Sequence, residues 1–401
     1  MRRDFRLLLL GQTTSQLGTQ VSGVAIPLLA VLTLGASPLQ LGMVTASGTL
    51  AFAVIGLPAG AWVDRWRRRR ILVASDVSRT VLLLTIPVAA ALGILTLTQL
   101  IAVCLLAGVA RVFFDVGYQS YLPAVTGHDR LLHANSAMET VRASGQVVGP
   151  GLGGWLVTAI GAANVVLLQA VTFAVSAASL LAIRAGEPQT AVPPGRLRTR
   201  MAEGLRLVAG TPLLRATAIT SAAGNLAFAI ASAVGIVFMV RGLHLSPTGV
   251  GLVIAVGSVT VMAGAALTPS LARAVGSARI VWVSLAVSGP IGLLAPLARP
   301  GWPVVLLVVG NAVGELGQIV YAITNVTVRQ RLCPAHMLGR VNATMRFLIM
   351  GMFPLGALIG GVLGELIGVR ATLWVSGGII VLSTLPVYRA LKGIRDVDNV
   401  V

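Results

Sequence analysis

Residues 60–72 read GAWVDRWRRRRIL, and this stretch places five arginines in six positions of a chain in which only 10% of residues are charged. An apolar run of more than 20 residues stands on each side of it. A helix of that length crosses the hydrocarbon core of a bilayer. The arginines therefore indicate a loop at a membrane surface, where basic side chains meet water and lipid head groups.

The composition of the whole chain agrees with a membrane protein. Of 401 residues, 56% are hydrophobic, 46 are glycine and only 12 are acidic, and the mean hydropathy is +0.90. A water-soluble domain cannot bury so much apolar surface. The formal charge of +18 could suggest nucleic-acid binding. The basic residues, however, form short clusters between apolar runs and no polar face with interleaved aromatics, so we expect no nucleic-acid partner.

Apolar runs of about this length recur along the chain, and strong helix formers dominate them. Helices satisfy their backbone hydrogen bonds inside lipid. The sequence therefore predicts an all-α integral membrane protein with twelve transmembrane helices. The runs cover approximately 5–32, 39–63, 71–93, 98–122, 137–160, 164–184, 213–240, 247–271, 278–298, 303–328, 341–366 and 370–391.

The distribution of basic residues predicts the orientation. When the loops are assigned alternately to two sides, 25 of the 30 basic residues fall on the side that carries both termini. The other side has only Arg241, Arg299 and Arg370. Basic residues resist translocation, so the rich side is expected to be cytoplasmic. We predict a multi-pass protein of a bacterial-type cytoplasmic membrane, with both termini in the cytoplasm.

The chain divides into two similar halves. Residues 185–212 form the longest polar stretch and read as a cytoplasmic linker, with a short amphipathic helix expected at 199–209. The predicted domains are a six-helix bundle at 1–184, this linker, and a second six-helix bundle at 213–401. A shift of 207 residues aligns residues 135–161 with residues 342–368 without gaps, which predicts two pseudo-symmetric bundles. The aligned residues include Asn135 with Asn342, Met138 with Met345, Gly149 with Gly356, Gly153 with Gly360 and Gly161 with Gly368.

Neither the cysteines nor the histidines suggest a metal site or a disulfide framework. Cys104 lies inside an apolar run and Cys333 lies in a loop. His128 and His133 share a loop but have no glutamate or cysteine beside them. We therefore expect no metal and no cofactor.

At this point the chain resembles the major facilitator superfamily over essentially its whole length. The opening stretch resembles that family's signature between helices 2 and 3, with matches at Gly60, Asp64, Arg65, Arg68 and Arg69 and with arginine in place of its second glycine. The resemblance implies that the aspartate contacts the cytoplasmic start of helix 11 and stabilises one state of the access cycle. Alternatively, the arginines only fix the topology and touch anionic lipid heads. The corresponding loop of the second half, at 273–279, contains no acid, so the contact is expected in one half only.

A second signature is GQVVGPGLGG at residues 145–154, and it resembles the helix 5 motif of the superfamily's exporters and antiporters. Pro150 removes a helical hydrogen-bond donor and bends the helix, while glycines let another helix approach closely. The alternative is ordinary glycine packing between helices. The motif residues are Gly145, Gly149, Pro150, Gly153 and Gly154. A further stretch, FFDVGYQSYLPAV followed by LLHANSAME, resembles the branch that includes macrolide-efflux proteins and the enterobactin exporter.

Polar residues form stripes on four of the predicted helices, helices 1, 4, 7 and 10. In the resembled fold these four helices line the central cavity, so the stripes are candidate substrate contacts. Bonds between neighbouring helices are the alternative. The candidates are Gln12, Gln16, Gln20, Gln119, Ser221, Asn225, Asn311, Gln318 and Asn325.

Charged residues inside transmembrane helices are costly and mark candidate functional sites. Glu315 has no basic residue within one turn and could gain and lose a proton, which makes it the first candidate for proton coupling or for binding a cationic substrate. Arg111 and Asp115, spaced by four, could gate, bind an anion or relay protons, or form a static pair. Asp76 and Arg79 are expected to form a structural pair near the arginine loop, or to take part in the conformational switch.

The sequence thus predicts a secondary active exporter of a small amphiphilic molecule, such as a drug, an antibiotic or a siderophore-like compound. It would work by alternating access, driven by proton antiport. The alternatives are a uniporter or importer of the same fold, or a membrane sensor or scaffold. An enzyme is not expected, because no helix supplies a nucleophile with a base. The expected partners are a small-molecule substrate, protons and membrane lipids, and nothing in the sequence requires more than a monomer.

Overall fold

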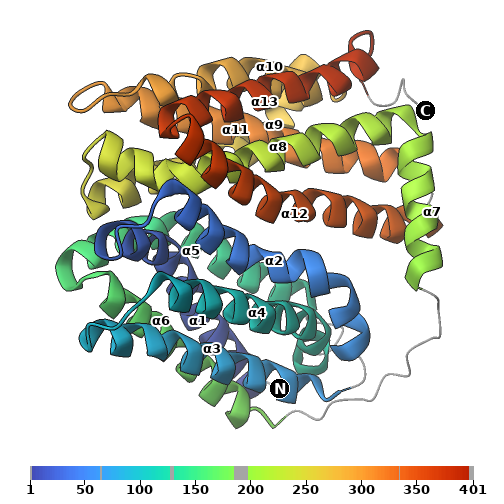
Figure 1. Ribbon diagram of the computed structural model, residues 1–401. Helices are drawn as coiled ribbons and strands as arrows, with labels where there is room; N and C mark the ends of the chain where they lie inside the picture. The colour runs from blue at the N-terminus through green and yellow to red at the C-terminus, as the bar shows by residue number, and fades with distance from the viewer. Residues whose placement is uncertain (1, 64–65, 127–130, 185–196, 334, 397–401) are drawn as a thin grey trace. The chain divides into compact units, whose positions relative to one another are not determined.

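A computed structural model of the chain describes residues 2–63, 66–126, 131–184, 197–333 and 335–396. These residues are almost entirely helical and contain no strand (Figure 1). The elements are α1 (Arg2–Leu28), η1 (Leu29–Thr33), α2 (Pro38–Val63), α3 (Arg68–Ala91), α4 (Leu97–Thr126), α5 (Leu131–Ile160), α6 (Ala162–Ala182), α7 (Leu197–Gly210), α8 (Pro212–Val237), η3 (Phe238–Gly242), α9 (Pro247–Val275), α10 (Arg279–Gly292), η4 (Ala295–Leu297), α11 (Val304–Leu332), α12 (Ala335–Leu366) and α13 (Val369–Leu391). The predicted all-α fold with twelve long helices is confirmed, and α7 lies over the short helix expected at 199–209.

Within the described residues, eleven helices are long and apolar enough to cross a membrane. The remaining long helix is α5, whose first half contains Glu139 and Arg142 and whose second half is rich in glycine. Many large apolar side chains are exposed along the spans, including Val54, Val81 and Val88. Such exposure is unfavourable in water and favourable in lipid. The chain is therefore a multi-pass membrane protein.

The chain separates into two compact units. Unit 1 comprises residues 1–193 and 245–255, and unit 2 comprises residues 194–244 and 256–401. Helices α1–α6 thus belong to unit 1, together with the first turns of α9. The predicted domain boundaries at 184 and 213 stay predictions, because residues 185–196 of the linker lie outside the described residues.

The two halves repeat the same backbone features. The first helix of each half ends in a π-helical turn, at Leu29–Thr33 and at Phe238–Gly242. The next helix begins with a proline in both cases. Gly161 and Gly368, which the sequence alignment pairs, each precede the sixth helix with φ of +84°. Only glycine adopts this conformation readily.

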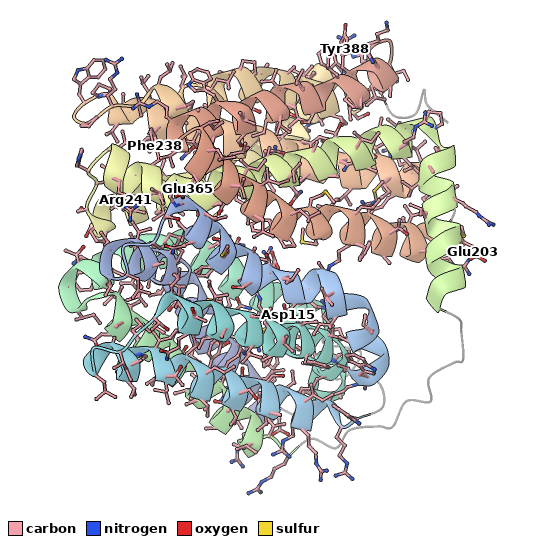
Figure 2. The ribbon with its side chains drawn as sticks, in the orientation of Figure 1. Asp115, Glu203, Phe238, Arg241, Glu365 and Tyr388 are labelled. Carbon is pink, nitrogen blue, oxygen red and sulfur yellow. The ribbon has the colours of Figure 1, made fainter. Side chains whose placement is uncertain are left out.

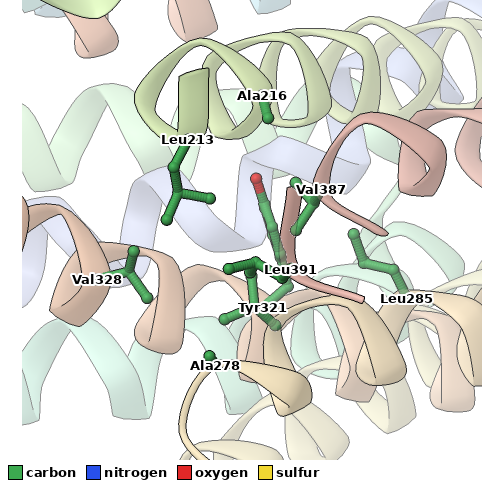
Figure 3. Packing of buried hydrophobic residues seen from close by; sticks show 9 residues of the cluster. Leu213, Ala216, Ala278, Leu285, Tyr321, Val328, Val387 and Leu391 are labelled. Atoms are coloured by element: carbon green, nitrogen blue, oxygen red, sulfur yellow. The ribbon is translucent and has the colours of Figure 1, made fainter. Parts of the chain in front are cut away.

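Each unit has a core of its own at the arginine-rich end. In unit 2 the core surrounds Tyr321, whose ring packs among Leu213, Leu285 and Val387 (Figure 3). The Tyr321 hydroxyl donates to the carbonyl oxygen of Thr217 at 3.1 Å, which satisfies its buried polar end. In unit 1 the corresponding cluster includes Leu8, Leu72, Phe114, Tyr121 and Leu180.

Helix α7 packs on the first half of α12 in unit 2 (Figure 1). Glu203 of α7 forms an ion pair with Arg340 of α12. A Cβ on Gly204 would lie 2.8 Å from the Arg340 carbonyl oxygen, so glycine permits this close approach.

In both units, the region where the third helix begins forms hydrogen bonds with the end of the sixth helix or with the segment that follows it. In unit 1 the Arg69 guanidinium donates to the carbonyl oxygens of Leu180 (2.8 Å) and Leu181. Both oxygens belong to the last turn of α6, where no further helical turn follows, and the positive charge complements the helix C-terminus. One of the arginines that match the family signature therefore also caps α6.

In unit 2 the roles of donor and acceptor are reversed, and we call this contact the C-terminal tie. The segment after α13 supplies the acceptors, and the start of α10 supplies the donors. The Arg395 carbonyl oxygen accepts from the N–H groups of Ala278 (3.0 Å) and Arg279 (3.2 Å). Asp396 accepts from the Ser277 N–H at 2.9 Å and from its hydroxyl at 3.2 Å. The loop at 273–279 lacks an acid of its own, and a carboxylate reaches it from 119 residues away.

Loss of this C-terminal tie is expected to destabilise unit 2. Gly276 has φ of +108°, and a Cβ there would overlap the Arg395 carbonyl oxygen. Gly276→Ala should cost at least roughly 1–2 kcal/mol from the backbone conformation alone. The thermal unfolding midpoint of the purified protein measures this effect. Gly393→Ala is the matched control, because a Cβ at Gly393 meets no atom within 4 Å. Equal midpoints for the two variants would contradict the tie.

The same tie has a predicted pH dependence. The hydrogen bond from the Ser277 N–H lowers the pKa of Asp396 below its ordinary value of 3.8. A carboxyl group whose pKa is lowered by folding stabilises the folded state at pH values above its ordinary pKa. This contribution to the free energy of unfolding disappears as the pH falls through the lowered pKa. The tie should therefore be intact from about pH 5 upward. Hydrogen exchange at the amides of residues 277–279 should accelerate only at more acidic pH, and Asp396→Asn should remove that dependence.

Candidate functional site

The glycines of the helix 5 motif lie where α5 meets α1 and the first turns of α9. A Cβ on Gly149 would overlap Gln20 of α1, and a Cβ on Gly153 would overlap the Val21 carbonyl oxygen. Both residues therefore let the α5 and α1 backbones touch. The proline of the motif, Pro150, lies within the continuous helix.

Gly154 faces the first turns of α9. A Cβ on Gly154 would overlap the Pro247 carbonyl oxygen and would lie 3.0 Å from the Gly251 Cα. Reciprocally, a Cβ on Gly251 would overlap the Pro150 carbonyl oxygen. A hydrogen bond of 2.9 Å between the hydroxyls of Thr158 and Thr248 continues the contact. The motif thus provides two backbone contacts, one with α1 and one with the start of α9.

The second half repeats the first of these contacts. A Cβ on Gly356 of α12 would lie 2.5 Å from the Leu226 carbonyl oxygen of α8, and one on Gly360 would lie 2.6 Å from the Ile230 carbonyl oxygen. The glycines paired by the sequence alignment therefore occupy equivalent helix contacts.

The polar stripe of α1 divides between two environments. Gln12 is buried, and its Nε2 has no hydrogen-bond partner among the described residues. Gln16 is half-buried. Gln20 lies against Gly149 and Gly145 of α5. The spacing of four residues groups these glutamines on one face of α1, and Gln20 belongs to the helix 5 contact as well as to the stripe.

Arg111 and Asp115 form the ion pair that their spacing predicts, with 3.6 Å between Nε and Oδ2. Their side chains are 61% and 42% exposed, so the pair lies at the surface of unit 1 and not in its interior. Asp115 is labelled on α4 in Figure 2. Gln119, one turn further along the same helix, is also exposed.

Asp76 and Arg79 form a hydrogen-bonded ion pair in the interior of unit 1, where they are 0% and 6% exposed. The Arg79 guanidinium lies 4.5 Å from the ring centroid of Phe114 and 4.2 Å from that of Phe173. Two aromatic faces and the hydrogen-bonded Asp76 carboxylate thus stabilise the buried Arg79 cation. This arrangement joins α3, α4 and α6 and favours the structural role of the pair. A role in switching stays a prediction.

The polar candidates of α8 and α11 lie together in unit 2. The Ser221 hydroxyl lies 2.8 Å from the Tyr321 hydroxyl and accepts from the Asn325 amide at 3.2 Å. Ser221 and Asn325 are only 7% and 5% exposed, so they are enclosed between the helices. Asn225 donates to the Ser221 carbonyl oxygen at 3.1 Å. Tyr321 joins this group without a signal in the sequence, because a tyrosine in an apolar run carries no polar periodicity.

The remaining α11 candidates lie at or near the surface of unit 2. Asn311 is exposed, while Glu315 and Gln318 are half-buried. Gln318 faces α8, with its Nε2 3.5 Å from the position of a Cβ on Gly224. Glu315 faces α9, with its Cγ 3.7 Å from the position of a Cβ on Gly257. Within the described residues, the Glu315 carboxylate forms no hydrogen bond and no ion pair.

The loop signature is only partly described. Gly60 lies in α2, and Arg68 and Arg69 begin α3. Asp64 and Arg65 lie outside the described residues. The expected contact of the aspartate with helix 11 therefore stays a prediction.

Comparisons with known proteins agree with this architecture. The Major Facilitator Superfamily model matches residues 8–351. The chain is 29% identical to the multidrug efflux pump Tap of Mycolicibacterium fortuitum, over 99% of this chain and 98% of that protein. It is 27% identical to the enterobactin exporter EntS of Citrobacter koseri, over 95% and 90% of the two chains.

Two solved structures share the fold. The nucleoside transporter NupG gives a TM-score of 0.75 with 14% identity, over 98% of this chain and 100% of that one. A bacterial homologue of the iron transporter ferroportin in its inward-facing state gives a TM-score of 0.79, with 17% identity over 97% of this chain and 98% of that one. At these identities the likeness concerns the fold alone.

Proposed function

Because the chain belongs to the Major Facilitator Superfamily, and so is a transporter rather than an enzyme, we propose that it exports a small amphiphilic molecule in exchange for protons. The observation that carries this proposal is the glycine and proline motif of α5. Its residues form backbone contacts with α1 and with the start of α9, and side chains larger than hydrogen would separate these helices. The motif resembles that of exporters. Similarity to two efflux proteins along nearly the whole chain also supports transport out of the cell.

Alternating access requires helices that can exchange one close contact for another. The contact of Gly154 with Pro247 and Gly251 suits this requirement, because it consists of backbone atoms with a single flanking hydrogen bond between threonines. Contacts between glycines hold helices close without interlocking large side chains. We propose that this contact forms in one access state and is released in the other.

Proton coupling is assigned to Glu315, with Arg111 and Asp115 as a second candidate group. Glu315 offers a carboxylate on a membrane-spanning helix without an ionic partner in the described part of unit 2. The Arg111–Asp115 pair is exposed on α4 and long, at 3.6 Å, so a substrate or proton could compete for the carboxylate. The uncharged polar residues of α1, α4, α8 and α11 would supply hydrogen bonds to the substrate.

The direct test is accumulation of candidate substrates in a bacterial host that lacks its own efflux pumps. Cells producing the protein should retain less of at least one antibiotic, dye or siderophore-like compound than cells producing the Gly154→Leu variant. Collapse of the proton gradient should abolish the difference. Higher retention in cells with the unaltered protein would instead identify an importer.

The orientation is tested by labelling single cysteines with an impermeant reagent in a variant in which Cys104 and Cys333 are replaced. Trp302 lies in the turn before α11 and is 83% exposed, and Arg206 is exposed on α7. Trp302→Cys should be labelled from outside intact cells, and Arg206→Cys only after the membrane is opened. The reverse pattern would overturn the cytoplasmic placement of the linker. In contrast, Ala36, although on the same predicted outer side, is fully buried and unsuited to labelling.

A further inference from the structure

A groove of about 1000 Å³ runs between α3 and α4 on the surface of unit 1. Its walls are apolar over most of their length, with Val77, Val81 and Leu82 on α3 and with Leu106, Val109 and Phe113 on α4. The Phe113 ring is stacked on the Trp62 ring, with 6.0 Å between their centroids. Both helices are membrane spans, so the groove opens toward the lipid or toward an aqueous cavity.

The position of the groove on α4 distinguishes these two possibilities. Val109 and Phe113 are each two residues from Arg111, which places them about 160° around the helix axis from it. The exposed Arg111–Asp115 pair therefore lies on the opposite face of α4 from the groove. Val109 and Phe113 are half-buried, while Leu106, Val77 and Val81 of the groove are exposed. An exposed apolar surface within membrane spans, turned away from the polar face, contacts lipid.

One end of the groove is charged. Arg67 and Arg70, both exposed, line it at the start of α3 together with the exposed ring of Trp66. No acidic residue lines the groove in the described part of the chain. From Arg70 to Leu82 the groove extends about 18 Å along α3 at 1.5 Å per residue. That length compares with the roughly 15 Å that one leaflet contributes to the hydrocarbon core.

From these observations we propose that the groove binds one anionic phospholipid from the leaflet at the arginine-rich side. The two guanidinium groups hold the phosphate, and the indole of Trp66 lies at the level of the head groups, where tryptophan is favoured. One acyl chain occupies the apolar length of the groove. The site uses arginines of the loop that are not needed for the family signature, and it does not depend on which substrate is carried.

The test uses the purified full chain, stripped of lipid, and counts bound lipids by native mass spectrometry. Dioleoyl phosphatidylglycerol is the probe, and dioleoyl phosphatidylcholine is the comparison with the same chains. The protein should bind the first more tightly. Arg67→Gln with Arg70→Gln should weaken phosphatidylglycerol binding roughly 5-fold for each arginine, or about 25-fold together, and leave phosphatidylcholine unchanged. Ala74→Trp, which fills the groove from an exposed position, should weaken both.

A matched variant, Arg206→Gln with Lys392→Gln, removes the same charge from exposed positions outside the groove. It should bind phosphatidylglycerol as the unaltered protein does. An equal loss in this variant, undiminished binding after substitution of both groove arginines, or displacement of the lipid by glycerol 3-phosphate would each overturn the proposal. If the paired substitution lowers the unfolding midpoint, the single variant Arg70→Gln is used instead. Its affinity for phosphatidylglycerol should fall roughly 5-fold.

Discussion

Gly154→Leu protein is expected to insert and fold but to transport roughly 5- to 150-fold more slowly than the unaltered protein. A Cβ at this position would overlap the Pro247 carbonyl oxygen, and a leucine side chain would push α5 and the start of α9 apart. Overpacking typically costs about 1–3 kcal/mol. If the contact exists in one access state only, that cost shifts the equilibrium between states by the stated factor.

The effect is measured as initial efflux rate per inserted molecule, with insertion determined from membrane fractions. Gly378→Leu on α13 is the control, since a Cβ there meets no atom within 4 Å. Gly153→Leu provides a contrast, because Gly153 touches α1 in the interior of unit 1 and its replacement should lower stability as well as transport. A Gly154→Leu protein with an unaltered rate would remove the α5–α9 contact from the transport cycle.

Glu315→Gln is expected to abolish proton-coupled accumulation while leaving substrate binding in place. Glutamine keeps the size and hydrogen-bonding capacity of the side chain but cannot carry a proton. In the described part of unit 2 no ion pair depends on this carboxylate, so the substitution should not disturb the fold. The measurement is substrate-induced proton flux in proteoliposomes, together with passive exchange of labelled substrate.

Asp115→Asn is the matched comparison for this experiment. Asp115 faces Arg111 at 3.6 Å, so its loss should leave an unpaired guanidinium on α4 and impair binding or gating. Reduced exchange with coupling retained is the expected pattern for that variant. Undiminished proton flux in Glu315→Gln protein would exclude Glu315 and transfer the coupling role to Asp115.

The membrane fold was predictable because its signals are long and local. Apolar runs of bilayer length, separated by short clusters of arginine, define helices without reference to other parts of the chain. Even α5 was identified, although Glu139 and its glycines make it less apolar than the eleven clear spans. The 207-residue repeat likewise placed Gly153 and Gly360 in equivalent positions, where both now face a carbonyl oxygen of the neighbouring helix.

The neighbours of the candidate side chains were not predictable in the same way. A stripe of residues spaced by four defines one face of a helix. Which helices or which solvent that face contacts depends on parts of the chain that are distant in sequence. Ser221 and Asn325 were expected in a cavity and lie enclosed beside Tyr321. The partner of the loop at 273–279 is Asp396, which no local pattern connects with it.

The two loop ties also set an order of events during synthesis. Arg69 can form its hydrogen bonds only after the carbonyl groups 111 and 112 residues later in the chain have been synthesised. Ser277 can bind its carboxylate only after a further 119 residues. At about 5–20 residues per second a ribosome needs roughly 5–25 s to supply either partner. During that interval the helix ends involved lack these hydrogen bonds, and each tie closes only when all six helices of its bundle exist. A nascent chain stalled before residue 180 or before residue 395 would therefore lack the corresponding hydrogen bonds.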